Sequence, residues 1–184
     1  MGQYYMGVLA RPRSDGFSPV PVAFEQEEAG GLKLMEHAWV GNSYCGWFCQ
    51  MIHHDPHHVA WVGDYSYDAD RPCPEDVFKA AWGGEPLGYS PNIDFNLDGT
   101  FLVNHTEKTY LNLGAYYQRV LNGKDPEENW VPHPLPLLTA FGNGMGGGDY
   151  RGINEDQVGI WAWDILSIED QAPNGFNEYI VDFN

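Results

Sequence analysis

The clearest periodic pattern in the chain predicts a helix between residues 40 and 55. Its apolar positions fall at offsets 0, 4, 7, 8, 11 and 12, which form one continuous helical stripe: Val40, Tyr44, Trp47, Phe48, Met51 and Ile52. Asn42 or Ser43 is expected to cap the start. Asp55 precedes a proline, which disfavours helical backbone, so the helix is expected to stop there.

Two further segments are expected to be helical. Residues 74–82 read PEDVFKAAW, with a proline at the start and acids in the first turn, where they favour the helix dipole. Residues 114–123 read GAYYQRVLNG and predict a short helix closed by Gly123.

Strand-like segments account for most of the remaining pattern. The opening residues QYYMGVLA predict a first strand, and PVPVAFE is expected to pair with it at a sheet edge, because proline cannot donate to a ladder. Leu97–Thr100 before FLVNH is expected to form a hairpin turn. The other expected strands are HVAWVGDY, LPLLTAF, VGIWAWDILSIE and NEYIVDF. Six or seven strands and two or three helices, without regular βαβ alternation, predict a single α+β domain over residues 1–184 with a mainly antiparallel sheet.

The net charge of −17, from nine Lys and Arg against 26 Asp and Glu, narrows the class of partner. A field of this sign repels phosphate backbones and anionic membranes, so no direct binding of nucleic acid or membrane is expected. The same field attracts a basic protein. Acidic runs at 25–28, 64–70, 125–128 and 155–156 form either an ordinary solvated surface or, if folded onto one side, a face that imitates nucleic acid.

The cellular compartment is expected to be the cytoplasm. The chain has three cysteines, too few for a disulfide framework, and its first residues lack the pattern of a signal peptide. No apolar run approaches the roughly 18 residues that a membrane span needs.

The glycine-rich stretch from Gly142 to Gly152 is the strongest chemical signal in the chain. It satisfies G-x-G-x-x-G, but a dinucleotide site also needs a helix after the motif, and the residues that follow are strand-like. A wide connection between two strands explains the glycines, and a nest of backbone amides for a small anion is the functional alternative. For such a ligand the expected contacts are Asn143, Gly144, Gly146, Gly147, Gly148, Asp149, Tyr150 and Arg151.

Histidines and cysteines supply candidate metal ligands. The run HHDPHH from His53 to His58 offers four imidazoles and a carboxylate, and Cys45, Cys49 and His53 lie along one side of the predicted helix. Burial of the cysteines and the helix dipole explain the same residues without a metal. No metal or other cofactor is therefore expected, and whether the His53–His58 cluster binds one stays open.

Two weaker signals complete the candidate sites. Residues 94–99 match the first half of an EF-hand loop, but His105 stands where the bidentate glutamate belongs. His37, His105 and His133 lie far apart in sequence, which leaves open whether they converge on a catalytic site. None of the common hydrolase, metalloprotease or P-loop motifs is present, so a non-catalytic role is favoured.

Several segments together resemble a family of small uncharacterised proteins that open with MGQYY. The segments are MGQYY, GLKLMEHAWVGN, VAWVGDY, FLVNHT, HPLPLLTAFGNGMGGGDYRG and VGIWAWDILSIE, which span nearly the whole chain. The resemblance links the chain to gut bacteria and to their phages or other mobile elements. It implies an accessory role, including defence and counter-defence, and brings no cofactor or catalytic residue with it.

The sequence therefore predicts an acidic cytoplasmic protein that binds a basic protein partner. In its most specific form this is a mobile-element inhibitor, of the anti-CRISPR-like, nucleic-acid-mimic type, of a nucleic-acid-binding host protein. The alternative is a nucleotide-like ligand-binding protein or small enzyme that uses Gly142–Gly152, with His133 as acid or base.

Overall fold

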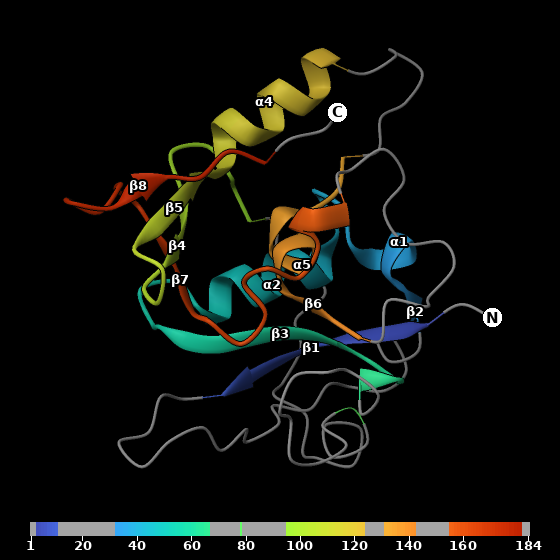
Figure 1. The fold of residues 1–184 in the computed structure, drawn as a ribbon. Coiled ribbons are helices and arrows are strands. Elements are labelled where there is room, and N and C mark those ends of the chain that lie inside the picture. Colours follow the sequence, from blue (N-terminus) through green and yellow to red (C-terminus); the bar gives the residue numbers. More distant parts are fainter. Residues whose placement is uncertain are drawn as a thin grey trace, which may run out of the picture.

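A single mixed sheet, mainly antiparallel, organises the protein (Figure 1). The computed structural model describes residues 3–10, 32–66, 78, 95–123, 131–142 and 155–181. Within them, seven strands follow the order β2-β1-β3-β7-β4-β5-β8, and an eighth, β6, pairs with β3 beside this path. The pairs β3–β6 and β5–β8 are parallel and the others antiparallel, which confirms the predicted α+β class.

The elements have the following bounds. The strands are β1 (Tyr4–Ala10), β2 (Leu32–Lys33), β3 (His57–Gly63), β4 (Phe101–Asn104), β5 (Thr109–Asn112), β6 (Ala140–Phe141), β7 (Ile165–Glu169) and β8 (Asn177–Glu178). The helices are α1 (Leu34–His37), α2 (Ser43–Met51), α4 (Leu113–Gly123), α5 (Pro134–Thr139) and the short 3₁₀ helix η2 (Glu155–Gln157). None of the helices in these ranges has the length and apolar character that crossing a membrane requires.

The β1–β3 ladder is the centre of the core and is buried on both faces. Its register runs from Tyr5 opposite Gly63 to Ala10 opposite His58. Because side chains alternate along a strand, Leu9 points into the large apolar cluster and Val8 into a smaller one. Helices α2 and α5 lie on the side of the large cluster (Figure 1). Burial on both faces explains why these strands read as continuous apolar runs.

Helix α2 confirms the strongest periodic prediction. The Asn42 side chain accepts hydrogen bonds from the backbone N–H groups of Tyr44 and Cys45, at 3.0 and 3.4 Å, and so caps the start. The helix ends at Met51, before the predicted Asp55. The carbonyl of the next residue, Ile52, accepts the N–H of Ile168 in β7, so the last turn is connected to the sheet.

The segment LPLLTAF, predicted as a strand, is mostly helix α5, and that prediction is wrong. His133 Nδ1 accepts the N–H of Leu135, and Pro134 stands at the first helical position. A cap followed by proline starts a helix, and a proline ring supplies the required φ. Only Ala140–Phe141 is extended.

The other predicted helices and strands are confirmed in some cases and shorter than predicted in others. The first strand, the HVAWVGDY strand and the 114–123 helix are confirmed as β1, β3 and α4. Of VGIWAWDILSIE, only β7 is strand, and of NEYIVDF, as far as it is described (residues 177–181), only β8 is strand. The turn at Asp98–Gly99 exists, but β4 forms its hairpin with β5. The predicted PVPVAFE strand and the 74–82 helix, Phe78 apart, lie outside the described residues.

Candidate functional site

Of the glycine loop, the structure describes only the first residue, Gly142. A Cβ at Gly142 would lie 2.5 Å from Oε1 of Gln3, so this position accommodates the buried Gln3 amide. The remaining loop positions, Gly152 included, and all of the expected ligand contacts lie outside the described residues: Asn143, Gly144, Gly146, Gly147, Gly148, Asp149, Tyr150 and Arg151.

The three isolated histidines do not share one cluster of hydrogen bonds. His37 is buried; its Nε2 accepts the Trp61 Nε1–H at 2.7 Å, and its Nδ1–H donates to the Lys33 carbonyl at 3.0 Å. Burial lowers the pKa of His37 to about 4, against the opposing effect of the Lys33 hydrogen bond. His105 instead contacts Ser167. We interpret His37 as a neutral structural residue.

His133, the expected acid or base of the enzyme alternative, caps α5 from inside the core. Its Nδ1 accepts a backbone N–H, so Nε2 carries the proton and faces the Cys49 sulfur at 3.6 Å. Burial lowers the pKa of His133 to about 3 and raises the pKa of the Cys49 thiol. A reactive cysteine needs a lowered thiol pKa, so this pair has the opposite electrostatics from an activated nucleophile and base.

The side chains of Cys45, Cys49 and His53 do not form a close group of ligand atoms. The Cys45 thiol donates to the carbonyl of His37, and both cysteines are fully buried. His53 lies beyond the helix end and turns to Asp170, a residue that the sequence did not single out. Among the described residues, the group whose ligand atoms lie close enough for one ion is His53, His54 and Asp170.

This group forms where the chain leaves α2 and meets the end of β7. The His54 N–H donates to the Ile168 carbonyl at 3.0 Å, and His53 forms a bridge with the same residue. These backbone contacts place both histidines beside residues 169 and 170. His54 has φ +57°, a left-handed conformation that is uncommon for a residue with a side chain.

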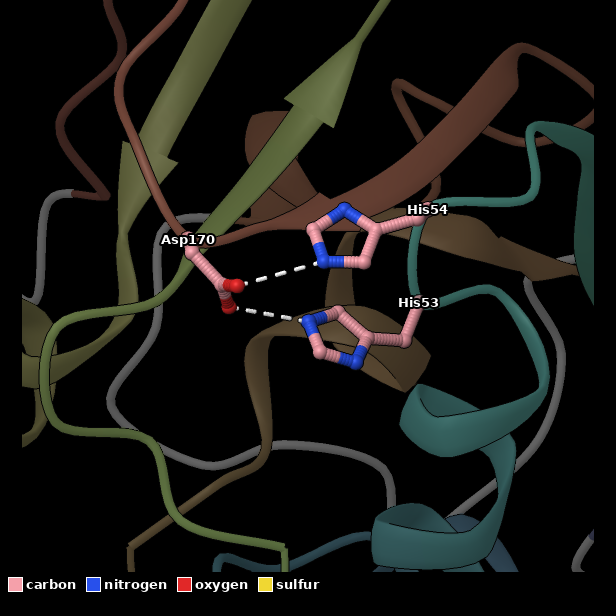
Figure 2. Close-up of side chains that lie close together, drawn as sticks. All are labelled: His53, His54 and Asp170. Atoms are coloured by element: carbon pink, nitrogen blue, oxygen red, sulfur yellow. Dashed lines mark hydrogen bonds and ion pairs between the residues drawn. The ribbon is translucent and has the colours of Figure 1, made fainter.

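Both imidazoles point at one carboxylate (Figure 2). The rings stack with centroids 4.0 Å apart. His53 Nε2 lies 2.9 Å from Asp170 Oδ1, and His54 Nε2 lies 3.2 Å from Asp170 Oδ2. The side chains of His54 and Asp170 are 53% and 61% exposed, so the group opens to solvent.

A chain of hydrogen bonds starts at the second ring nitrogen of His54, the one that does not face Asp170. Its Nδ1–H donates to Glu169 Oε2 at 2.8 Å, and Glu169 Oε1 accepts the Ser167 hydroxyl at 2.6 Å. His105 Nε2–H in turn donates to the Ser167 oxygen at 2.8 Å. The Glu169 hydrogen bond raises the pKa of His54, and the His53 hydrogen bond lowers the pKa of Asp170. Burial favours the neutral Glu169 carboxyl, but the hydrogen bonds from Ser167 and His54 outweigh it and lower its pKa.

The HHDPHH run therefore divides into two pairs. His57 Nδ1–H donates to the Asp55 carbonyl at 2.7 Å, and His58 Nδ1–H donates to the Trp163 carbonyl at 2.8 Å. Both belong to β3 and hold its start in place. Only His53 and His54 face Asp170.

The partial EF-hand match reflects a turn. Asn96 Oδ1 accepts the N–H of Asp98 at 3.0 Å, and Gly99 has φ +75°. Both features build a loop that leads into β4. Asp94, the first position of the match, lies outside the described residues.

An open cleft of about 280 Å³ lies beside this turn. Its lining includes Val40, Phe95, Asn96, Asp98 and Tyr117, from the connection between α1 and α2, the turn and α4.

Comparison of the chain with protein-family models, with curated proteins and with solved structures gives no match.

Proposed function

We propose that this protein is an acidic binding protein whose surface engages a basic protein partner. The observation that carries the proposal is the net charge of −17 on 184 residues. Such a field attracts cationic surfaces and accelerates association with them.

The described residues support the proposal with exposed carboxylates on many separate turns and ends of elements. These are Glu36, Asp55, Asp98, Glu107, Asp156, Asp170 and Glu178. The described part of the chain contains three lysine or arginine residues, Lys33, Lys108 and Arg119. Arg119 donates a hydrogen bond to the Val181 carbonyl. Negative charge on the described surface is thus little offset by neighbouring cations.

The resemblance to proteins of phages and mobile elements makes the proposal more specific. A host defence protein that binds nucleic acid does so through a basic groove. A mobile element benefits when this groove is blocked. We therefore extend the proposal to a counter-defence inhibitor that competes with nucleic acid for a host protein.

Affinity capture tests the proposal. The immobilised protein is incubated with nuclease-treated bacterial lysate at low salt, beside an unrelated protein of similar size and charge. We expect selective recovery of a protein with a basic surface, its release as added salt shortens the Debye length from about 30 Å toward 8 Å, and displacement by short nucleic acid. Recovery of no basic protein, or of the same set on both acidic baits, would refute the proposal.

Paired charge removal then locates the contact face. Glu107→Gln with Glu178→Gln removes charge beside β5 and β8, whereas Asp55→Asn with Asp170→Asn removes it beside α2 and β7. If the partner is held electrostatically, one pair slows association more than the other, measured with the purified partner by surface plasmon resonance. Unchanged association in both pairs would place the contact elsewhere on the surface.

A further inference from the structure

We propose that His53, His54 and Asp170 bind a divalent transition-metal ion of the zinc type, with Glu169 positioning His54. This site is independent of the proposed partner binding. It follows from three side chains that lie together at the junction of α2 and β7 (Figure 2) and from the hydrogen bond between His54 and Glu169.

The donor set fits this class of ion. Two imidazole nitrogens and a carboxylate oxygen are ligands that zinc, cobalt and nickel accept, whereas calcium and magnesium prefer oxygen alone. Ligands at about 2.0–2.1 Å from a tetrahedral ion lie roughly 3.3 Å from one another. The nitrogen–oxygen distances, 2.9 Å to Asp170 Oδ1 and 3.2 Å to Asp170 Oδ2, are close to this value, and the ligand atoms all lie within 4.8 Å of one another.

The charge of the cluster also calls for a cation. Asp170 and Glu169 bring two negative charges to two imidazoles, and both nitrogens of His54 point at carboxylate oxygens. In the absence of metal, protons on these nitrogens satisfy the carboxylates. A divalent ion takes the place of the Nε2 protons, which pass to solvent, and balances the two carboxylates.

Glu169 has the position of an outer-shell partner. It accepts the His54 Nδ1–H, which fixes the tautomer that presents the Nε2 lone pair to an ion. Ser167 and His105 fix Glu169 in turn. Metal-bound histidines commonly donate their second N–H to a carboxylate in this way.

The backbone at the site has an uncommon conformation that the contact with β7 maintains. His54 has φ +57°, and its backbone N–H donates to the Ile168 carbonyl. The sheet contact thus holds His54 in a conformation that stacks its ring on that of His53. Strained backbone of this kind concentrates at binding sites, where it fixes side chains in advance.

Titration with cobalt(II) tests the site. Tag-free protein treated with chelator is titrated with Co²⁺, and binding is followed by the visible absorption of the coordinated ion. We expect one ion per chain, displaced by Zn²⁺. His54→Ala and Asp170→Ala should each weaken binding by more than the about 10–100-fold that loss of an outer partner costs.

Three further variants distinguish direct ligands from a residue that positions a ligand and from the other histidines of the HHDPHH run. Glu169→Ala should weaken Co²⁺ binding about 10–100-fold with the band shape kept, and Glu169→Gln should restore part of the loss, because glutamine still accepts the His54 proton. His58→Gln, in the same HHDPHH run, should bind like wild type. Circular dichroism checks that each variant is folded.

Two results would overturn the inference. One is wild-type protein that shows no stoichiometric Co²⁺ or Zn²⁺ binding. The other is binding that survives His54→Ala and Asp170→Ala, or that falls equally with His58→Gln, because the ion would then be held by the histidine run in general. Neither result bears on the capture of a basic partner.

Discussion

Individual histidines in this protein have two opposite electrostatic environments. His37 and His133 are buried and neutral, and burial lowers the pKa of each, to about 4 and about 3. His54 is exposed between two carboxylates, and the Glu169 hydrogen bond raises its pKa. The residue type is the same, so solvent access and neighbours decide which histidines support the core and which are available to bind an ion.

Acid should destabilise the fold through the buried histidines. In the unfolded chain His133 is protonated below about pH 6.5, whereas in the native protein its pKa is about 3. The contribution of neutral His133 to the free energy of unfolding is therefore complete above pH 6.5 and is lost as pH falls toward 3. Each pH unit in this window costs about 1.4 kcal/mol per histidine. His133→Asn keeps a capping acceptor for α5 and should flatten the dependence of unfolding free energy on pH, measured by urea denaturation at several pH values.

His37→Gln provides the second arm of this experiment. It should reduce the acid dependence in the same direction over a narrower window, because the pKa of His37 is about 4. A pH dependence that matches wild type in both variants would show that the buried histidines do not set acid stability.

The packing of helices and strands depends on glycines at positions where a side chain would overlap neighbouring backbone. Gly159 follows η2, has φ +75°, and lies against the carbonyl of Ala140, where α5 passes into β6. Its N–H donates to the Leu137 carbonyl at 2.9 Å. This contact joins the turn before β7 to α5.

Gly159→Ala should therefore destabilise the protein by about 3 kcal/mol or more, from left-handed backbone strain and from the overlap with Ala140. Gly175→Ala is the matched control, because Gly175 has φ +79° but no atom near a new Cβ. It should cost about 1–2 kcal/mol, the backbone strain alone. Equal losses for the two variants, in urea denaturation, would contradict the packing argument.

The protein as a unit carries a strong excess of negative charge, and this charge opposes folding. With −17 on the chain, mutual repulsion disfavours the compact state. The fold withstands it because apolar burial on both faces of β1 and β3 is extensive.

Added salt should raise the melting temperature. Raising NaCl from about 0.01 M to 0.15 M shortens the Debye length from about 30 Å to 8 Å and weakens the repulsion. For a chain of this length a gain of about 1 kcal/mol corresponds to roughly 2–4 °C. Calorimetry with NaCl and KCl at equal ionic strength checks the effect; a melting temperature that falls or depends on the cation would contradict it.

Local pattern in the sequence was sufficient for α2, α4, β1 and β3. Helical spacing and the Asn42 cap act within a few residues, so they can be read from neighbours along the chain. The same reasoning placed LPLLTAF in a strand, because a short apolar run looks alike in a buried helix and a buried strand. The His133 cap and Pro134 at the helix start decide the outcome there.

The candidate metal site lay beyond such reasoning. The sequence offered His53 and His54, but Asp170 follows them by 117 and 116 residues, and only the pairing of Ile52 and His54 with Ile168 brings them together. The neutral state of His37 and His133 likewise depends on exclusion of water by distant segments. Charge, caps and periodicity are thus fixed by the chain, whereas burial and the meeting of remote side chains are set by tertiary packing, because solvent exclusion and strand pairing are non-local.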